Sequence, residues 1–109
     1  MTPQKFINDI HHHIDLLVEQ YSLGKDGPTY LGHYLDMLNV DEHERDKVIS
    51  LIRLAAGEAI HSLISGIEGK TPIGERYQQY QLISETGNDI TGGLSERLRR
   101  KLEKELDTP

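Results

Sequence analysis

Apolar residues recur three and four positions apart in several segments of the chain, which is the spacing of one face of an α-helix. This pattern predicts helices over residues 6–22, 29–38, 42–67 and 93–106. The stripe of the first helix comprises Phe6, Ile7, Ile10, Ile14, Leu17, Val18 and Tyr21. That of the second comprises Tyr30, Leu31, Tyr34, Leu35 and Leu38, and that of the last Leu94, Leu98, Leu102 and Leu106.

The helix predicted over residues 42–67 is the most apolar of the four. Its main stripe comprises Val48, Ile49, Ile52, Ala56, Ala59, Ile60, Leu63 and Ile67. Leu51 and Leu54 lie off this stripe, and a helix that is apolar around much of its circumference is usually covered on more than one side. We expect it to be either the central helix of the fold or one wall of a homodimer.

Residues 72–84 can be interpreted in two ways. Thr71 and Pro72 resemble a helix start, whereas the alternation of apolar residues with glutamines is typical of a strand. The letters "ETGND" that follow are typical of a turn. We favour a small β-hairpin with strands near 77–84 and 88–91, which would need to pack on the helices because an isolated hairpin is marginally stable.

Together these elements predict an α+β fold that is predominantly α, with a hairpin near 77–91. At 109 residues, the chain is expected to form a single domain, 1–109. It has no cysteine, so disulfides and cysteine nucleophiles are excluded. We find no uninterrupted apolar run of the length of a signal peptide or a membrane span, and we expect a soluble protein of the cytoplasm.

The charge balance constrains the class of partner. Twelve Lys and Arg against eighteen Asp and Glu give a net charge of −6, which argues against general binding to nucleic acid. Much of the acid lies in the first helix and in "DEHERD" at residues 41–46, while residues 95–104 are locally basic. An acidic face of this kind would favour a basic protein partner.

Three consecutive histidines, His11 to His13, are the most conspicuous feature of the first helix. Successive helical residues are about 100° apart, so these rings cannot converge on one ion. Asp9 and His13 are four positions apart, as are His11 and Asp15. Each pair could supply only half of the ligands of a divalent-metal site. We therefore favour a solvated helix face.

The spacing Glu58-x-x-His61 also occurs in di-iron helical bundles, where two copies and further glutamates complete the site. This chain holds one copy. A metal site built from Glu58, His61 and His13 is the alternative hypothesis, and a polar pair without metal is the one we favour.

No catalytic motif is found, and "TGGLSERL" at residues 91–98 lacks the lysine of a phosphate-binding loop. We expect a non-enzymatic protein without a cofactor that acts by surface complementarity. The predicted contact residues are, on the outer face of the first helix, Asp9, His12, Asp15 and Glu19 and, on the hairpin, Tyr77 and Tyr80.

Residues 54–100 run from "GEAIHSLISGIEG" through a short loop to "YQQYQLISETGNDITGGLSERL". This layout resembles small bacterial immunity-type and uncharacterised accessory proteins. The resemblance implies a non-enzymatic role in binding a partner, such as neutralising a toxin. The first helix lies outside it.

Overall fold

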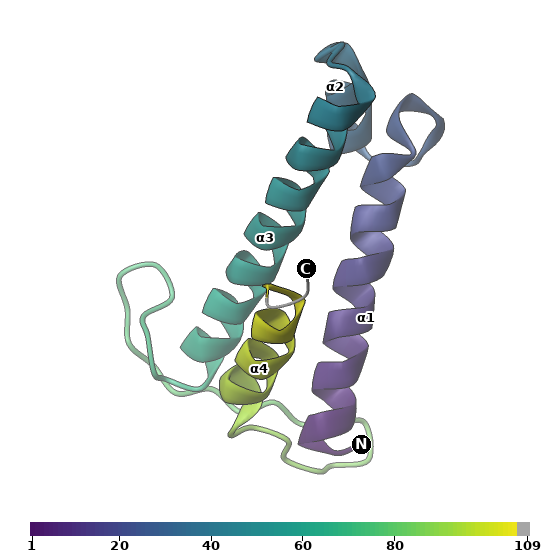
Figure 1. Cartoon of the computed structure of the whole chain (residues 1–109). Coiled ribbons are helices and arrows are strands. Elements are labelled where there is room, and N and C mark those ends of the chain that lie inside the picture. Colours follow the sequence, from purple (N-terminus) through teal and green to yellow (C-terminus); the bar gives the residue numbers. More distant parts are fainter. Residues whose placement is uncertain (107–109) are drawn as a thin grey trace. The chain divides into compact units, whose positions relative to one another are not determined.

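The protein is built from helices (Figure 1). The computed structural model describes residues 1–106, which form α1 (Pro3–Ser22), α2 (Tyr30–Met37), α3 (Glu42–Ile67) and α4 (Leu94–Leu106). A 3-10 turn, η1 (Gly24–Asp26), lies between α1 and α2. The four predicted helices are confirmed, and α1 begins a few residues earlier than its apolar stripe indicated.

The chain forms two compact units. Unit 1 comprises Met1–His11 and Gly57–Pro109, and unit 2 comprises His12–Ala56. The two boundaries fall inside α1 and inside α3, so each of these helices contributes to both units. The expectation of a single domain stays a prediction.

Side-chain oxygens cap the first turns of three helices. The Lys5 amide donates to Thr2 Oγ1 (3.1 Å), and the Gly32 amide donates to Thr29 Oγ1 (3.0 Å). The amide of Glu44 donates to Asp41 Oδ1 (2.8 Å). Each cap satisfies a backbone amide that has no partner within its helix, and so helps to set where the helix begins.

The core of unit 1 contains Ile7, Ile64, Leu94 and Leu98, all buried. Partly buried side chains surround it: Phe6, Ile10, Ile60, Leu82 and Leu102. The members of this core on α1 and α4 belong to the stripes predicted for those helices. On α3, however, the buried Ile64 lies off the predicted stripe, and Leu63 of that stripe is exposed, so the sequence pattern identifies the buried face of α1 and α4 in unit 1 but that of α3 only in part.

The predicted α+β fold is wrong. Within residues 1–106 the structure contains no strand, and the segment near 77–91 holds one isolated antiparallel bridge, Ile83 to Asp89. A second bridge joins Ile73 to Arg76. The fold is all-α, with a long connection between α3 and α4 in place of the hairpin.

The hydrogen bonds of the connection explain this difference. A turn is present at residues 84–88, as "ETGND" predicted. Beyond it, however, the Tyr80 amide donates to the Ile67 carbonyl at the end of α3 (3.1 Å). The Leu82 amide donates to Thr91 Oγ1 (2.6 Å), a side chain. Two backbone bonds cross between the arms, from the Ser84 amide to the Asn88 carbonyl (2.8 Å) and from the Ile90 amide to the Leu82 carbonyl (2.9 Å). Because the amides of Tyr80 and Leu82 bond elsewhere, the pairing does not extend further into a hairpin.

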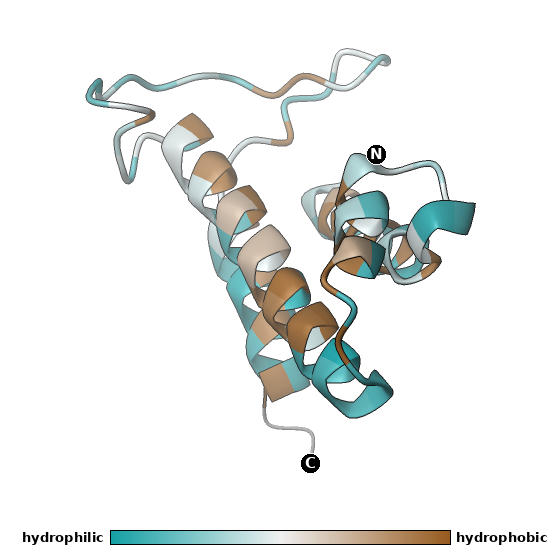
Figure 2. Ribbon diagram, turned by 90° about the horizontal axis from the view of Figure 1, so that it is seen from above, coloured by the Kyte–Doolittle hydropathy of each residue, from teal (hydrophilic) through white to brown (hydrophobic). Residues whose placement is uncertain are grey.

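Apolar residues continue along α3 beyond its hydrophilic first turns (Figure 2). Leu51, Leu54 and Leu63 are exposed, so the expectation that α3 is covered on several sides does not hold at these positions. By length and composition alone α3 could cross a membrane, a criterion that core helices of soluble proteins can also meet.

Candidate functional site

The most exposed apolar side chains of unit 2 lie on α2. Tyr30, Tyr34 and Met37 follow the i, i+4, i+7 spacing of one helical face and are 88%, 66% and 74% exposed. Large apolar side chains clustered on a surface mark interaction sites far more often than single ones do. These three side chains, together called the α2 ridge, are the first candidate site.

A hollow flanks the α2 ridge on each side. The larger, about 440 Å³, is called the α2–α3 groove, and its lining is almost wholly apolar: Leu31, Tyr34, Leu35, Met37, Leu38, Val48 and Ile52. The smaller, about 410 Å³, is lined by Pro28, Thr29, Tyr30, His33, Tyr34 and Met37. Tyr34 and Met37 line both hollows, so the ridge stands between two depressions that another molecule could enter.

Asp36 holds the opposite face of α2 in place. Its carboxylate accepts hydrogen bonds from the Lys25 amide of η1 and from Arg45 Nη1 of α3, each at 2.7 Å. Arg45 Nη2 also donates to the Ser22 carbonyl at the end of α1 (3.1 Å). The Lys25 amide, and then the Arg45 guanidinium, hold the pKa of Asp36 below its usual range. The carboxylate is therefore charged at neutral pH and joins three segments of unit 2.

Glycines at positions 24 and 32 allow α2 to lie close to η1. Gly24 has a φ of +66°, and a Cβ there would lie 2.4 Å from Asp36 Oδ2. A Cβ on Gly32 of α2 would lie 2.7 Å from the Gly24 carbonyl oxygen. The packing of α2 on η1 thus depends on two missing side chains, and the α2 ridge is left on the exposed side.

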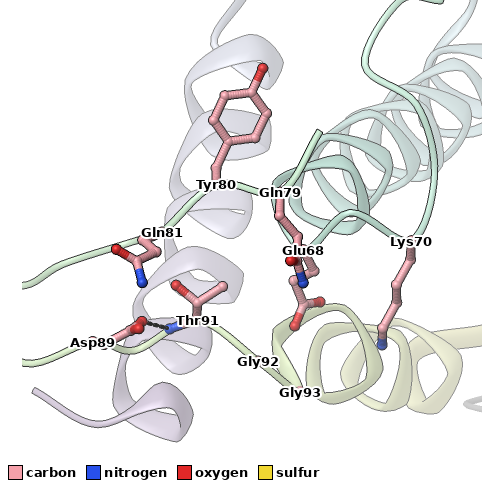
Figure 3. A pocket seen from close by; sticks show the side chains of 9 residues that line it. All are labelled: Glu68, Lys70, Gln79, Tyr80, Gln81, Asp89, Thr91, Gly92 and Gly93. Atoms are coloured by element: carbon pink, nitrogen blue, oxygen red, sulfur yellow. Dashed lines mark hydrogen bonds between the residues drawn. The ribbon is translucent and has the colours of Figure 1, made fainter. Parts of the chain in front are cut away.

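The second candidate site is a polar hollow in unit 1 (Figure 3). It has a volume of about 820 Å³ and is lined by Glu68, Lys70, Gln79, Tyr80, Gln81, Asp89, Thr91, Gly92 and Gly93. All nine belong to the connection between α3 and α4, from the residue that follows α3 to the residue that precedes α4.

Glu68, the buried acid of the polar hollow, is already used by the fold. Its carboxylate accepts the amides of Leu94 (3.0 Å) and Ser95 (2.8 Å) in the first turn of α4. Burial raises the pKa of Glu68, but the Ser95 hydroxyl, these amides and Lys70 outweigh that effect and hold the pKa below its ordinary value. Glu68 therefore serves as a charged cap of α4, and the hollow offers no unsatisfied buried carboxylate for chemistry.

The predicted contact residues of the first helix lie on α1. Asp9, His12 and Glu19 are exposed there, whereas Asp15 is half-buried and accepts a hydrogen bond from Arg53 Nη1 of α3 (2.5 Å). Asp15 thus has a partner within unit 2. The role of these four residues as a contact surface stays a prediction.

Tyr77 and Tyr80 lie in the connection between α3 and α4, because the hairpin on which we expected them is not formed. Both are exposed, and the ring of Tyr80 points away from Asp89 and Thr91 (Figure 3). They do not cover the core of the molecule. Their role as contact residues is a prediction that the structure does not test.

The alternative metal site would use Glu58, His61 and His13. Glu58 and His13 are exposed and His61 is half-buried. Among the residues that the structure describes, no hydrogen bond or ion pair joins Glu58 to His61. His11 of the histidine run lies with its Nε2 2.6 Å from Glu105 Oε1 of α4.

Sequence reasoning missed two features. The role of Glu68 depends on amides 26 and 27 positions later in the chain, and no local pattern indicates that pairing. Of the α2 ridge, Tyr30 and Tyr34 belong to the predicted apolar stripe of residues 29–38, whereas Met37 does not, and none of the three was predicted as a contact residue. Their signal was the presence of two tyrosines on a short helix, since tyrosine tolerates partial exposure.

Comparison with protein-family models, with curated proteins and with solved structures finds no match for this chain. The resemblance of residues 54–100 to immunity-type proteins is therefore neither supported nor opposed by these comparisons.

Proposed function

We propose that this protein is a non-enzymatic, cytoplasmic interaction module and that the α2 ridge and the two hollows beside it form its binding surface for another protein. The observation that carries the proposal is the exposure of Tyr30, Tyr34 and Met37 on one helical face. Burying such side chains in a complex would contribute roughly 1.5–3 kcal/mol each before the costs of association.

The rest of unit 2 supports this assignment. The Asp36–Arg45 ion pair and the glycines of η1 and α2 hold the ridge on an ordered scaffold. A surface that is already ordered before binding loses less conformational entropy in the complex. In the polar hollow of unit 1, by contrast, the buried carboxylate has a structural task. Neutralisation of a toxin, or another regulatory task, remains a hypothesis about which partner is bound.

Site-specific photo-crosslinking in the cells that produce the protein tests the proposal. A photoreactive phenylalanine analogue replaces Tyr34 in one variant, His12 in a second and Tyr77 in a third. We expect a discrete crosslinked product from position 34. Crosslinks only from position 12 or 77 would transfer the binding surface to α1 or to the α3–α4 connection, and no product from any position would contradict the proposal.

A further inference from the structure

We infer that the partner segment is an amphipathic α-helix whose apolar face is flanked by basic residues, and that this apolar face lies in the α2–α3 groove. This inference rests on the proposed function and names the chemistry of the partner. Its basis is the combination of an apolar groove, an acidic border and exposed aromatic rings within unit 2.

The size of the α2–α3 groove fits a row of apolar side chains. An engineered cavity of about 150 Å³ holds one benzene ring, so a groove of about 440 Å³ has room for two or three side chains. Its walls come from two helices, with Leu31 and Leu35 on α2 and Val48 and Ile52 on α3. Grooves of this type accept a helix through residues at i, i+3 or i+4, and i+7.

The border of the groove is acidic. Residues 23–47 contain six carboxylates, Asp26, Asp36, Asp41, Glu42, Glu44 and Asp46, against three cations, Lys25, Arg45 and Lys47. Glu44 lies one turn before Val48 on the same face of α3, and Asp41, which caps the first turn of α3, lies about two turns before it, so both are at the end of the groove. Arg45 is paired with Asp36, and Lys47 Nζ lies 3.5 Å from Glu44 Oε1. The other four carboxylates face Lys25 as the one remaining cation of this segment, which leaves the border acidic.

The tyrosines of the α2 ridge add a second kind of complementarity. Tyr30 and Tyr34 are one turn apart and both are mostly exposed. An aromatic face attracts a lysine or arginine placed over it, and the attraction grows when water is displaced. A helix whose apolar side chains enter the groove would place its flanking cations near these rings and near the acidic border.

The same charges disfavour other occupants. A second copy that docked through the same surface would place its own acidic segment against this one, and like charges across an interface weaken it. The basic residues 95–104 are no alternative, because Leu94 and Leu98 of α4 are already buried in the core of unit 1. An anionic lipid surface or a nucleic acid would meet the same repulsion. The charge distribution therefore favours a basic helix from a different protein.

Synthetic peptides test the inference on the full chain. Three peptides of about 18 residues, or five helical turns, share a leucine stripe and differ in their flanking residues: lysine, glutamine or glutamate. A fourth has the lysine composition in scrambled order. Binding is followed by amide chemical shifts and fluorescence anisotropy. We expect the lysine peptide to bind with shifts at residues 31–52 and at least about tenfold more tightly than the glutamate peptide.

Matched variants separate charge from fold. Glu42→Gln/Glu44→Gln reduces the acid of the border, and Glu75→Gln/Glu85→Gln makes the same change at exposed positions of unit 1. We expect the first pair of substitutions to lower the affinity for the lysine peptide by about fivefold, since exposed charge pairs contribute modestly to binding. The second pair should change this affinity by less than about twofold. Tyr34→Gln should lower the affinity for every peptide that binds, whereas Tyr77→Gln should leave these affinities unchanged.

The other outcomes are distinct. Equal binding of the lysine and glutamate peptides, or of the scrambled peptide, overturns the basic helix as partner. Absence of all peptide binding, with a crosslink from position 34, overturns this inference and leaves the proposed function in place. Absence of both overturns both. Concentration-dependent dimerisation through residues 31–52 would identify a second copy as the occupant, and binding of anionic vesicles in place of peptides would identify a membrane. Either result overturns the inference.

Discussion

Units 1 and 2 use their apolar residues differently. In unit 1 apolar residues of three helices form a core that contains Ile7, Ile64, Leu94 and Leu98, all buried. Unit 2 also has buried apolar residues on α1 and α2, but α2 leaves two tyrosines and a methionine exposed. The contrast shows that an apolar stripe alone does not identify the core, because one stripe can hold both buried and exposed residues.

The largest effect should come from the core of unit 1. Leu98→Ala removes a side chain with no exposed surface and should lower the free energy of unfolding by about 3 kcal/mol, measured by urea denaturation, because a cavity remains. Leu51→Ala, at an exposed position of α3 in unit 2, is the control and should cost about 0.5 kcal/mol or less. Similar losses in the two variants would contradict the distinction between the units.

This distinction also explains how far the sequence could predict the fold. The helices were predictable because a stripe of period 3.6 persists for several turns. The structure adds side-chain caps at Thr2, Thr29 and Asp41, where three of the helices begin. The hairpin prediction failed since alternation over a few residues also arises in a polar connection. In that connection the Tyr80 amide donates to the carbonyl at the end of α3, and the Leu82 amide donates to the side chain of Thr91.

The candidate site was less predictable than the fold. The stripe on α2 correctly grouped Tyr30 and Tyr34 with Leu35, yet only Leu35 is buried. Which side of a short apolar helix meets solvent depends on what packs against it. Here this is decided by Asp36, whose partners Lys25 and Arg45 lie 11 and 9 positions away.

The next effect concerns the charged cap in unit 1. Glu68→Gln keeps the shape of the side chain but removes its charge, so the amides of Leu94 and Ser95 lose a carboxylate acceptor. We expect a loss of about 2 kcal/mol in unfolding free energy at neutral pH. Glu85→Gln, at an exposed position of the α3–α4 connection, should change it by less than about 0.5 kcal/mol.

The same cap should appear in the pH dependence of stability. The pKa of Glu68 is lower in the folded protein than its ordinary value of 4.5, so its contribution is fully present above about pH 4.5. That contribution is lost as the pH falls through the folded value. We expect the difference between the wild type and Glu68→Gln to shrink steadily below pH 4.5 in denaturation series. A difference that stays constant in acid would exclude the charge as the cause.

A smaller effect is expected where unit 2 positions α2. Gly24→Ala forces a residue with φ of +66° to carry a Cβ that would overlap the Asp36 carboxylate. Gly87→Ala introduces the same kind of backbone strain, with φ of +88°, where no atom lies within 4 Å. We expect losses of about 2 and 1 kcal/mol respectively, and their difference isolates the collision with Asp36. Equal losses would mean that the backbone angle alone requires glycine at position 24.

Substitutions in the α2 ridge should have the smallest effect on stability. They test most directly whether the exposed apolar residues of unit 2 differ in role from the buried ones of unit 1. Tyr30→Gln/Tyr34→Gln should change the unfolding free energy by less than about 1 kcal/mol, because both rings are mostly exposed and glutamine favours helix at least as well as tyrosine. The same pair should clearly reduce the fluorescence of a dye that binds exposed apolar surface, whereas Tyr77→Gln/Tyr80→Gln should reduce it little. If the α2 tyrosines instead contribute several kcal/mol to folding, they belong to the core of unit 2, and the proposed binding surface must be abandoned.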